Sequence, residues 1–120
     1  MNLNVVILCG NLVDDPEVKM VGDKKKAVFR LAVNDRNEAS FFTCEAWGVT
    51  AETVEMYAKK GFEIVVQGSV RIDEFEKDGV KRYYPKVHVN RVSLGNNRLK
   101  GFSKSIEDDT GVLYVRNEDE

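Results

Sequence analysis

The sequence is poor in the residues that most catalytic and metal sites require. It contains one histidine, two cysteines and two prolines, and its longest apolar run is Val5–Cys9. A single histidine, His88, allows no histidine pair, and no Cys-x-x-Cys motif, Cys/His cluster or glycine-rich phosphate loop is present. We therefore expect a protein that is not an enzyme and that uses no cofactor and no metal. The apolar run is also far shorter than the roughly 20 residues that a membrane span needs, so we expect no membrane association.

The cysteines and the first residues bear on the cellular compartment. Cys9 and Cys44 both lie in apolar, strand-like runs, and we expect both to be buried thiols that stay reduced. The opening Met-Asn-Leu-Asn has no basic or apolar region typical of a secretion signal. These features predict a cytoplasmic protein.

Size and charge indicate one globular domain followed by an acidic tail. The chain has 120 residues, of which 42% are hydrophobic and 32% charged, as in ordinary soluble domains. Residues 101–120 hold two basic and six acidic side chains, a net charge of -4, so residues 1–100 carry +2 within the total of -2. A mildly basic body permits a polyanionic partner. We place the domain at 1–100 and the tail at 101–120, and 111–115 is apolar enough for an extra strand or a docking segment.

Alternating apolar and polar residues predict strands over most of the chain. Asn4–Leu12 is expected to be a largely buried first strand, which breaks at Asp14–Pro16 and resumes at Glu17–Met20. Further strands are expected near 26–34, 40–47, 64–73 and 81–92. Their predicted inward side chains are Ala27, Phe29, Leu31, Val33, Phe42, Cys44, Ala46, Ile64, Val66, Val70, Ile72, Tyr83, Val87 and Val89.

One helix is predicted between the third and fourth strands. Thr50 is its expected N-cap, Lys59–Gly61 its expected end, and an apolar stripe runs along 51–58. Three strands, a helix and two strands form the order of a five-stranded OB-fold barrel, and Gly10 and Gly68 supply bends that help a small sheet to close. The predicted fold class is therefore all-β, an OB-fold barrel with one helix and an acidic C-terminal tail.

Large aromatic side chains occupy the polar face of the third strand. Phe41 and Trp47 share the parity of Thr43 and Glu45, whereas Phe42 faces the core. Exposed rings on a polar face call for an explanation. The same argument on the last two strands completes the set of candidate stacking residues: Phe41, Trp47, Phe75 and Tyr84.

Basic side chains surround these rings. The candidate phosphate-binding residues are Lys24, Lys25 and Lys26 in the loop before the second strand, together with Arg30, Arg71, Lys77, Lys81, Arg82 and Lys86. Rings interleaved with cations suit single-stranded nucleic acid, because bases stack on aromatic side chains while lysine and arginine follow the phosphates. Two other interpretations stay open: the rings cover a hydrophobic seam or a subunit interface, and the lysine run is a solvated loop.

A set of short segments spans about residues 3–95: Asn4–Leu12, Asp15–Val18, Leu31–Val33, Trp47–Gly48, Ala51–Glu52, Tyr57–Gly61, Val66–Gly68 and Arg71. In their residues and their order, these segments resemble the bacterial-type single-stranded DNA-binding proteins. The resemblance implies an OB fold that binds single-stranded DNA without sequence preference in replication, recombination and repair, in the nucleoid. It also implies base stacking on Phe41, Trp47 and Phe75, and a homotetramer or dimer that pairs through the first strand.

The sequence departs from the pattern of that family at two places, and each departure leads to an expectation. The loop Asn34–Ser40 is short, and Asn37 stands about where the family offers another aromatic side chain, which predicts weaker binding or a smaller site. The tail ends Arg116–Glu120 without the Pro-Phe tip that recruits replication and repair proteins, so recruitment by that mode is in question. Small variants from cyanobacteria, plastids or phages share such traits. The alternatives are an OB-fold assembly module with reduced DNA affinity and a single-stranded RNA binder.

Overall fold

The computed structural model describes residues 1–95 and 112–114. Helix α1 (Gly48–Tyr57) lies between β4 and β5, as predicted, and no helix in the described ranges is long and apolar enough to cross a membrane. The strands are β1 (Val6–Leu12), β2 (Glu17–Val21), β3 (Lys24–Asp35), β4 (Glu38–Trp47), β5 (Glu63–Lys77), β6 (Val80–Leu94) and β7 (Val112–Tyr114).

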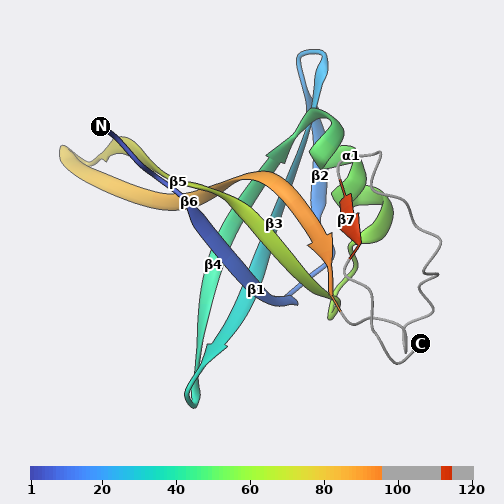
Figure 1. The fold of residues 1–120 in the computed structure, drawn as a ribbon. Helices are drawn as coiled ribbons and strands as arrows, with labels where there is room; N and C mark the ends of the chain where they lie inside the picture. The colour runs from blue at the N-terminus through green and yellow to red at the C-terminus, as the bar shows by residue number, and fades with distance from the viewer. Residues whose placement is uncertain (96–111, 115–120) are drawn as a thin grey trace.

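Five strands close into a barrel in the order β1-β5-β6-β4-β3, with β3 returning to β1. The closing contact is short, because β1 pairs with β3 only through Asn11 and Leu12 in the described residues. β2 then continues along the same edge of β3, so the predicted break and resumption of the first strand is confirmed. Figure 1 shows the strands crossing obliquely, with α1 against one end of the barrel. The predicted OB fold is therefore confirmed.

Two glycines allow neighbouring strands to approach closely. A Cβ atom at Gly10 would overlap the backbone of Ala32 on β3, and one at Gly68 would overlap the backbone of His88 on β6. The register of the β5–β6 pair shifts between Gln67 and Gly68, which is the β-bulge expected of a glycine inside a strand. Both positions therefore require glycine for lack of space, and both help the barrel to close.

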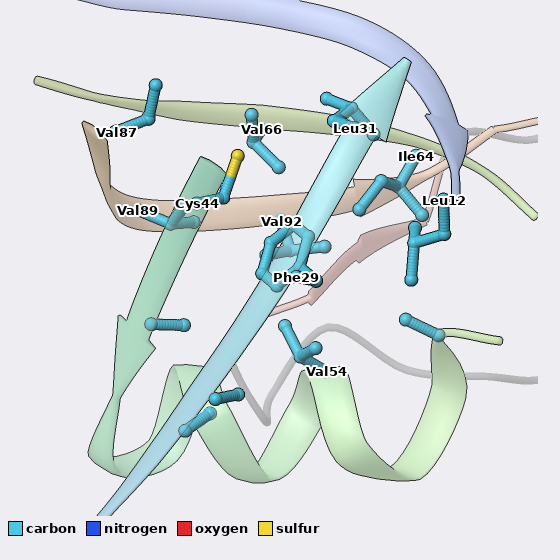
Figure 2. Close-up of a cluster of buried hydrophobic side chains, with 14 of the residues drawn as sticks. Leu12, Phe29, Leu31, Cys44, Val54, Ile64, Val66, Val87, Val89 and Val92 are labelled. Carbon is cyan, nitrogen blue, oxygen red and sulfur yellow. The ribbon is translucent and has the colours of Figure 1, made fainter. Parts of the chain in front are cut away.

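The core fills the barrel and extends onto the helix. Figure 2 shows side chains from all five barrel strands converging above Val54 of α1. The predicted helical stripe is confirmed, since Ala51, Val54 and Ala58 are fully buried. Each buried Leu, Val, Ile or Phe stabilises the fold by about 1.5–3 kcal/mol before entropy is counted. The buried set also includes Leu12, Ala27, Phe29, Leu31, Cys44, Ala46, Ile64, Val66, Val87, Val89, Val92 and Leu94.

The prediction of a largely buried first strand with a buried Cys9 is wrong. Ile7 is 62% exposed and Cys9 is also exposed, because β1 packs only its other face on the barrel. Partial burial and the nearby Glu63 carboxylate still raise the pKa of the Cys9 thiol. Cys44 is buried as predicted, and burial raises its pKa to about 12, so this thiol stays protonated at neutral pH.

Both predicted ends of the helix are also wrong. The helix starts at Gly48, directly after Trp47 at the end of β4, and no side chain caps it. Gly48 makes this abrupt turn with a φ of 61°, a conformation that glycine adopts at low cost. Thr50 therefore lies inside the first turn, and the helix stops at Tyr57, ahead of the lysines.

The β5–β6 hairpin reaches well beyond the barrel. Figure 1 shows this extension (yellow) projecting away from the other strands. Its predicted inward residues Val70, Ile72 and Tyr83 are 40%, 62% and 62% exposed, because no second layer covers that part of the sheet. We call residues 71–84 the hairpin arm.

Part of the C-terminal segment joins the sheet. β7 pairs in parallel with the end of β6, at Val92, Ser93 and Leu94, which confirms the extra strand expected within 111–115. The rest of the predicted acidic tail lies outside the described residues, as does the proposed domain boundary at residue 100.

Candidate nucleic-acid interface

Four strands place the predicted rings on one side of the barrel. On the β3–β4 ladder, Lys26 is opposite Trp47 and Ala32 is opposite Phe41, and directly opposed residues share a face. The Lys26 ammonium lies 5.4 Å from the Trp47 ring centre, and the Arg30 guanidinium lies 5.2 Å from that of Phe41. These are cation–π distances. A cation therefore already stands over each ring.

The hairpin arm continues the same surface. On the β5–β6 ladder, Asp73 is opposite Tyr84 and Phe75 is opposite Arg82. A hydrogen bond of 2.9 Å between the hydroxyls of Tyr84 and Thr43 joins β6 to β4. Phe75 and Tyr84 are 46% and 47% exposed, and Phe41 is 55% exposed. We call the surface that carries Phe41, Trp47, Phe75 and Tyr84 the aromatic face.

Two carboxylates hold lysines at the centre of the aromatic face. Glu45 Oε2 lies 3.1 Å from Lys86 Nζ and 3.5 Å from Lys26 Nζ, and Asp73 Oδ2 lies 2.8 Å from Lys86 Nζ. The hydrogen bond to Asp73, followed by that to Glu45, raises the pKa of Lys86. Lys86 therefore stays charged, and nearby carboxylates partly offset the charge of Lys86 and of Lys26 before any ligand arrives.

His88 lies half-buried on this face, opposite Glu45. Burial lowers its pKa, with further lowering from the Arg71 and Lys86 charges that outweighs the opposing Glu45 carboxylate. The imidazole is therefore neutral near pH 7. The predicted outward orientation is confirmed.

Two of the nine predicted phosphate-binding residues point elsewhere. Lys25 forms a 2.6 Å ion pair with Glu55 of α1, and Lys81 forms a 3.2 Å ion pair with Glu74 on the other side of the hairpin arm. The lysine run is also not a loop, because Lys24–Lys26 begin β3, and alternation along the strand separates Lys25 from its neighbours.

Five of the remaining predicted cations form no ion pair with a carboxylate within residues 1–95. Within residues 1–95, none of the following lies within ion-pair distance of a carboxylate: Lys24, Arg30, Arg71, Lys77 and Arg82. Arg71, Lys77 and Arg82 all share the alternation of Phe75, which places them on the aromatic face.

Sequence reasoning did not assign any role to the acidic residues of this face. Their signal was present, because Glu45 shares the parity of Trp47 and Asp73 that of Phe75. What the strand pattern could not supply was the pairing of β4 with β6, which brings Glu45 to Lys86. The described residues include no group of three or more His, Cys, Asp or Glu side chains placed to hold a metal ion.

The predicted loop Asn34–Ser40 is tighter than expected. β3 runs to Asp35 and β4 starts at Glu38, so only Arg36 and Asn37 form the turn, with a φ of 57° at Arg36. Asn37 therefore sits at the tip of a hairpin, without a neighbouring ring in the turn.

Comparison with known proteins agrees with this geometry. The chain matches the model described as the single-strand binding protein family over residues 3–94. It is 37% identical over 110 residues to the single-stranded DNA-binding protein of Clostridium perfringens, covering 84% of this chain and 73% of that protein. It is 34% identical to that of Clostridium tetani (98% and 89% covered) and 35% identical to single-stranded DNA-binding protein 1 of Nostoc sp. (78% and 84% covered).

Proposed function

The chain belongs to the single-strand binding protein family, and we propose that it binds single-stranded DNA without sequence preference through the aromatic face. Its bases stack on Phe41, Trp47, Phe75 and Tyr84, and its phosphates contact Lys24, Lys26, Arg30, Arg71, Lys77, Arg82 and Lys86. It acts as a binding protein, rather than as an enzyme, in replication, recombination and repair.

The observation that carries this proposal is the continuity of exposed rings and cations across four strands. A base stacked on an aromatic side chain contributes about 1–3 kcal/mol, whatever its identity. The rings lie on β4, β5 and β6, with cations on the same face of these strands and of β3, which matches the alternation of bases and phosphates along a nucleic-acid strand. A buried hydrophobic seam is not consistent with Phe41, Phe75 and Tyr84 each being about half exposed.

Quenching of Trp47 fluorescence by oligo(dT) of increasing length tests the proposal directly. Trp47 is the only tryptophan, so the signal has one source. We expect saturable quenching, with log affinity falling against log salt concentration by roughly 0.7 per phosphate contact. The same titration with oligo(U) measures any preference for DNA over RNA. An emission that stays constant at low salt would reject this face as the binding site.

A substitution of Trp47 removes the ring without changing the net charge, so it measures the contribution of stacking to DNA affinity. We expect Trp47→Ala to weaken oligo(dT) binding by about 1–3 kcal/mol, measured by anisotropy of a labelled oligonucleotide. The control is Tyr83→Ala, which removes a ring that is 62% exposed on the opposite side of the hairpin arm and should leave the affinity unchanged. Equal losses in the two variants would argue against stacking on Trp47.

We further propose that the protein works as a homo-oligomer, a tetramer or else a dimer, paired through β1. Ile7 on this strand and Val5 directly before it are 62% and 58% exposed, and exposed apolar residues on a strand with an incomplete partner favour association. Several linked subunits on one DNA strand raise affinity through effective concentration. The acidic tail offers a contact for replication and repair proteins, and we place the protein with the nucleoid.

A further inference from the structure

A pocket opens beside the aromatic face where β4 and β6 separate. The two strands pair only through Cys44–Val87 and Glu45–His88 among the described residues, and beyond these pairs they diverge. The pocket has a volume of about 390 Å³. This size lies within the range of roughly 300–1,000 Å³ that small-molecule pockets occupy.

The walls of the pocket are mainly apolar and come from four strands. Val6, Phe42 and Val70 belong to the lining, together with Phe41 and Tyr84 of the aromatic face. The pocket therefore links the ring-bearing surface to the unfilled end of the barrel core.

Asn4 holds two of these walls in place. Its side-chain amide donates to the Val70 carbonyl (2.7 Å), and its side-chain carbonyl accepts from the Val70 N–H (2.9 Å). These two bonds continue the β1–β5 ladder one step past Val6, which is opposite Gly68. Val6 and Val70 are thus fixed before a ligand arrives, so the pocket is preformed.

The lining residues with polar side chains are Thr43, Tyr84 and Lys86. The Thr43 and Tyr84 hydroxyls are bonded to each other, and either can donate, so the pair can offer a donor or an acceptor to a ligand. The Lys86 ammonium also belongs to the lining. Apolar walls, a few adaptable polar atoms and a cation suit a flat heteroaromatic ring attached to a phosphate.

We propose that this pocket takes one nucleobase of the bound strand, turned out of the stacked row and inserted between Phe41 and Tyr84, with its phosphate near Lys86. The proposal rests on the proposed function and assigns one site within it. The occupant follows from continuity, because a strand that stacks on both Phe41 and Tyr84 must pass over the opening between them. Burying both faces of the base, rather than one, makes this position the most strongly held.

Filling the pocket tests the proposal. Val70→Phe adds a ring that projects from the pocket wall, whereas Ile72→Phe adds the same ring two residues along β5, at a position that is 62% exposed and outside the pocket. We expect Val70→Phe to weaken oligo(dT) binding at least about five-fold, the lower end of one stacked base, and Ile72→Phe to change it less than two-fold. Equal affinities of the two variants, or tighter binding by Val70→Phe, would overturn the proposal. Circular dichroism of both variants checks that they fold.

Methyl NMR of the unmodified sequence provides a second measurement that needs no variant. A base in the pocket should shift the Val6 and Val70 methyl signals upfield on addition of oligo(dT), through its ring current. If Trp47 is quenched while these methyls stay unmoved, the pocket proposal fails and the proposed function stands. If Trp47 is not quenched either, the proposed function fails. Methyl shifts that instead follow protein concentration would assign the pocket to a second copy of the chain and overturn the proposal.

Discussion

At the residue scale, the central carboxylate of the aromatic face limits how strongly that face attracts phosphate. Glu45 holds both Lys26 and Lys86 and is itself largely shielded from solvent, with 12% of its side chain exposed. A negative charge at this depth repels phosphates and withholds two cations from them. Removing it should therefore strengthen DNA binding, the opposite of what loss of a contact usually does.

We expect Glu45→Gln to increase the affinity for oligo(dT) by about 0.5–1 kcal/mol at low salt, in the range of single exposed ion pairs. Lys26 loses its carboxylate partner and Lys86 keeps only Asp73, so the salt dependence should also become steeper, which is measured in the same titrations. The matched control is Glu74→Gln, which frees Lys81 on the other side of the hairpin arm. A weaker affinity of Glu45→Gln would mean that the carboxylate orients the lysines rather than competing for them.

His88 gives the binding a pH dependence. Its pKa is lowered in the free protein, chiefly by burial and by Arg71, so the imidazole is neutral at pH 7. Bound phosphates favour the charged form and raise this pKa, so binding takes up a proton and affinity rises as pH falls through the range in which the imidazole titrates. Titrations with oligo(dT) between about pH 7.5 and 5.5 should show this slope in the original sequence and lose it in His88→Gln. An identical slope in both would place the titrating group elsewhere.

At the scale of elements, the β-bulge opposite Gly68, where β6 contributes the extra residue Asn90, constrains how β5 and β6 pair. Gly68 faces the His88 backbone so closely that even a methyl group has no room. Backbone, unlike the end of a long side chain, cannot move aside without distorting the ladder. The stability of the barrel therefore depends on glycine at position 68, because its side chain is a single hydrogen atom.

We expect Gly68→Ala to lower the free energy of unfolding by about 1–3 kcal/mol, the usual cost of overpacking, measured by urea denaturation. The adjacent Ser69→Ala is the control, since Ser69 is half-buried next to the same bulge. An unchanged urea midpoint for Gly68→Ala would show that β6 shifts without cost.

Unlike the site of Gly68, the hairpin arm contributes little to the stability of the fold. Every residue from Arg71 to Pro85 is exposed, so the arm adds little apolar burial and its substitutions cost little stability. The arm nevertheless carries Phe75, Arg82 and Tyr84. The arm, which extends from the barrel, therefore contributes binding surface rather than stability.

At the scale of the whole molecule, charge is divided between a basic body and an acidic tail. Residues 1–100 carry +2 and residues 101–120 carry -4. Tail carboxylates that approach the body compete with phosphates for the same cations. At 0.1 M salt, this competition is screened for charges more than about 10 Å apart.

Deleting residues 101–120 should raise the affinity for oligo(dT) at low salt and have little effect at high salt, measured by Trp47 quenching. This deletion also removes β7, which pairs with β6. A second variant that replaces Glu118, Asp119 and Glu120 with Gln, Asn and Gln keeps β7 while removing three negative charges. If neither variant binds more tightly, the tail does not compete with DNA, and the assembly-module interpretation gains support.

The sequence by itself determined the face on which each strand residue lies, because alternation is a local property with a period of two. This was enough to predict the barrel, the helix between its third and fourth strands, and the grouping of Phe41 and Trp47 with the polar residues of their strand. The glycines at 10 and 68 could also be assigned to bends that help the sheet to close, whereas the close approach of the Ala32 and His88 backbones is visible only in the structure.

Only the tertiary structure decided which of these residues meet. Glu45 and Lys86 are 41 positions apart, and their ion pair depends on a parallel β4–β6 register that no local pattern encodes. The same holds for Lys25 and Lys81, which resemble the other cations in sequence but face Glu55 and Glu74. The burial of Ile7, Ile72 and Tyr83 was predicted wrongly for a related reason: alternation says which residues of one strand share a face, but not whether another layer covers that face. The path of the chain in space decides which side chains pair and which strand faces are covered by another layer. The local sequence pattern does not contain this information.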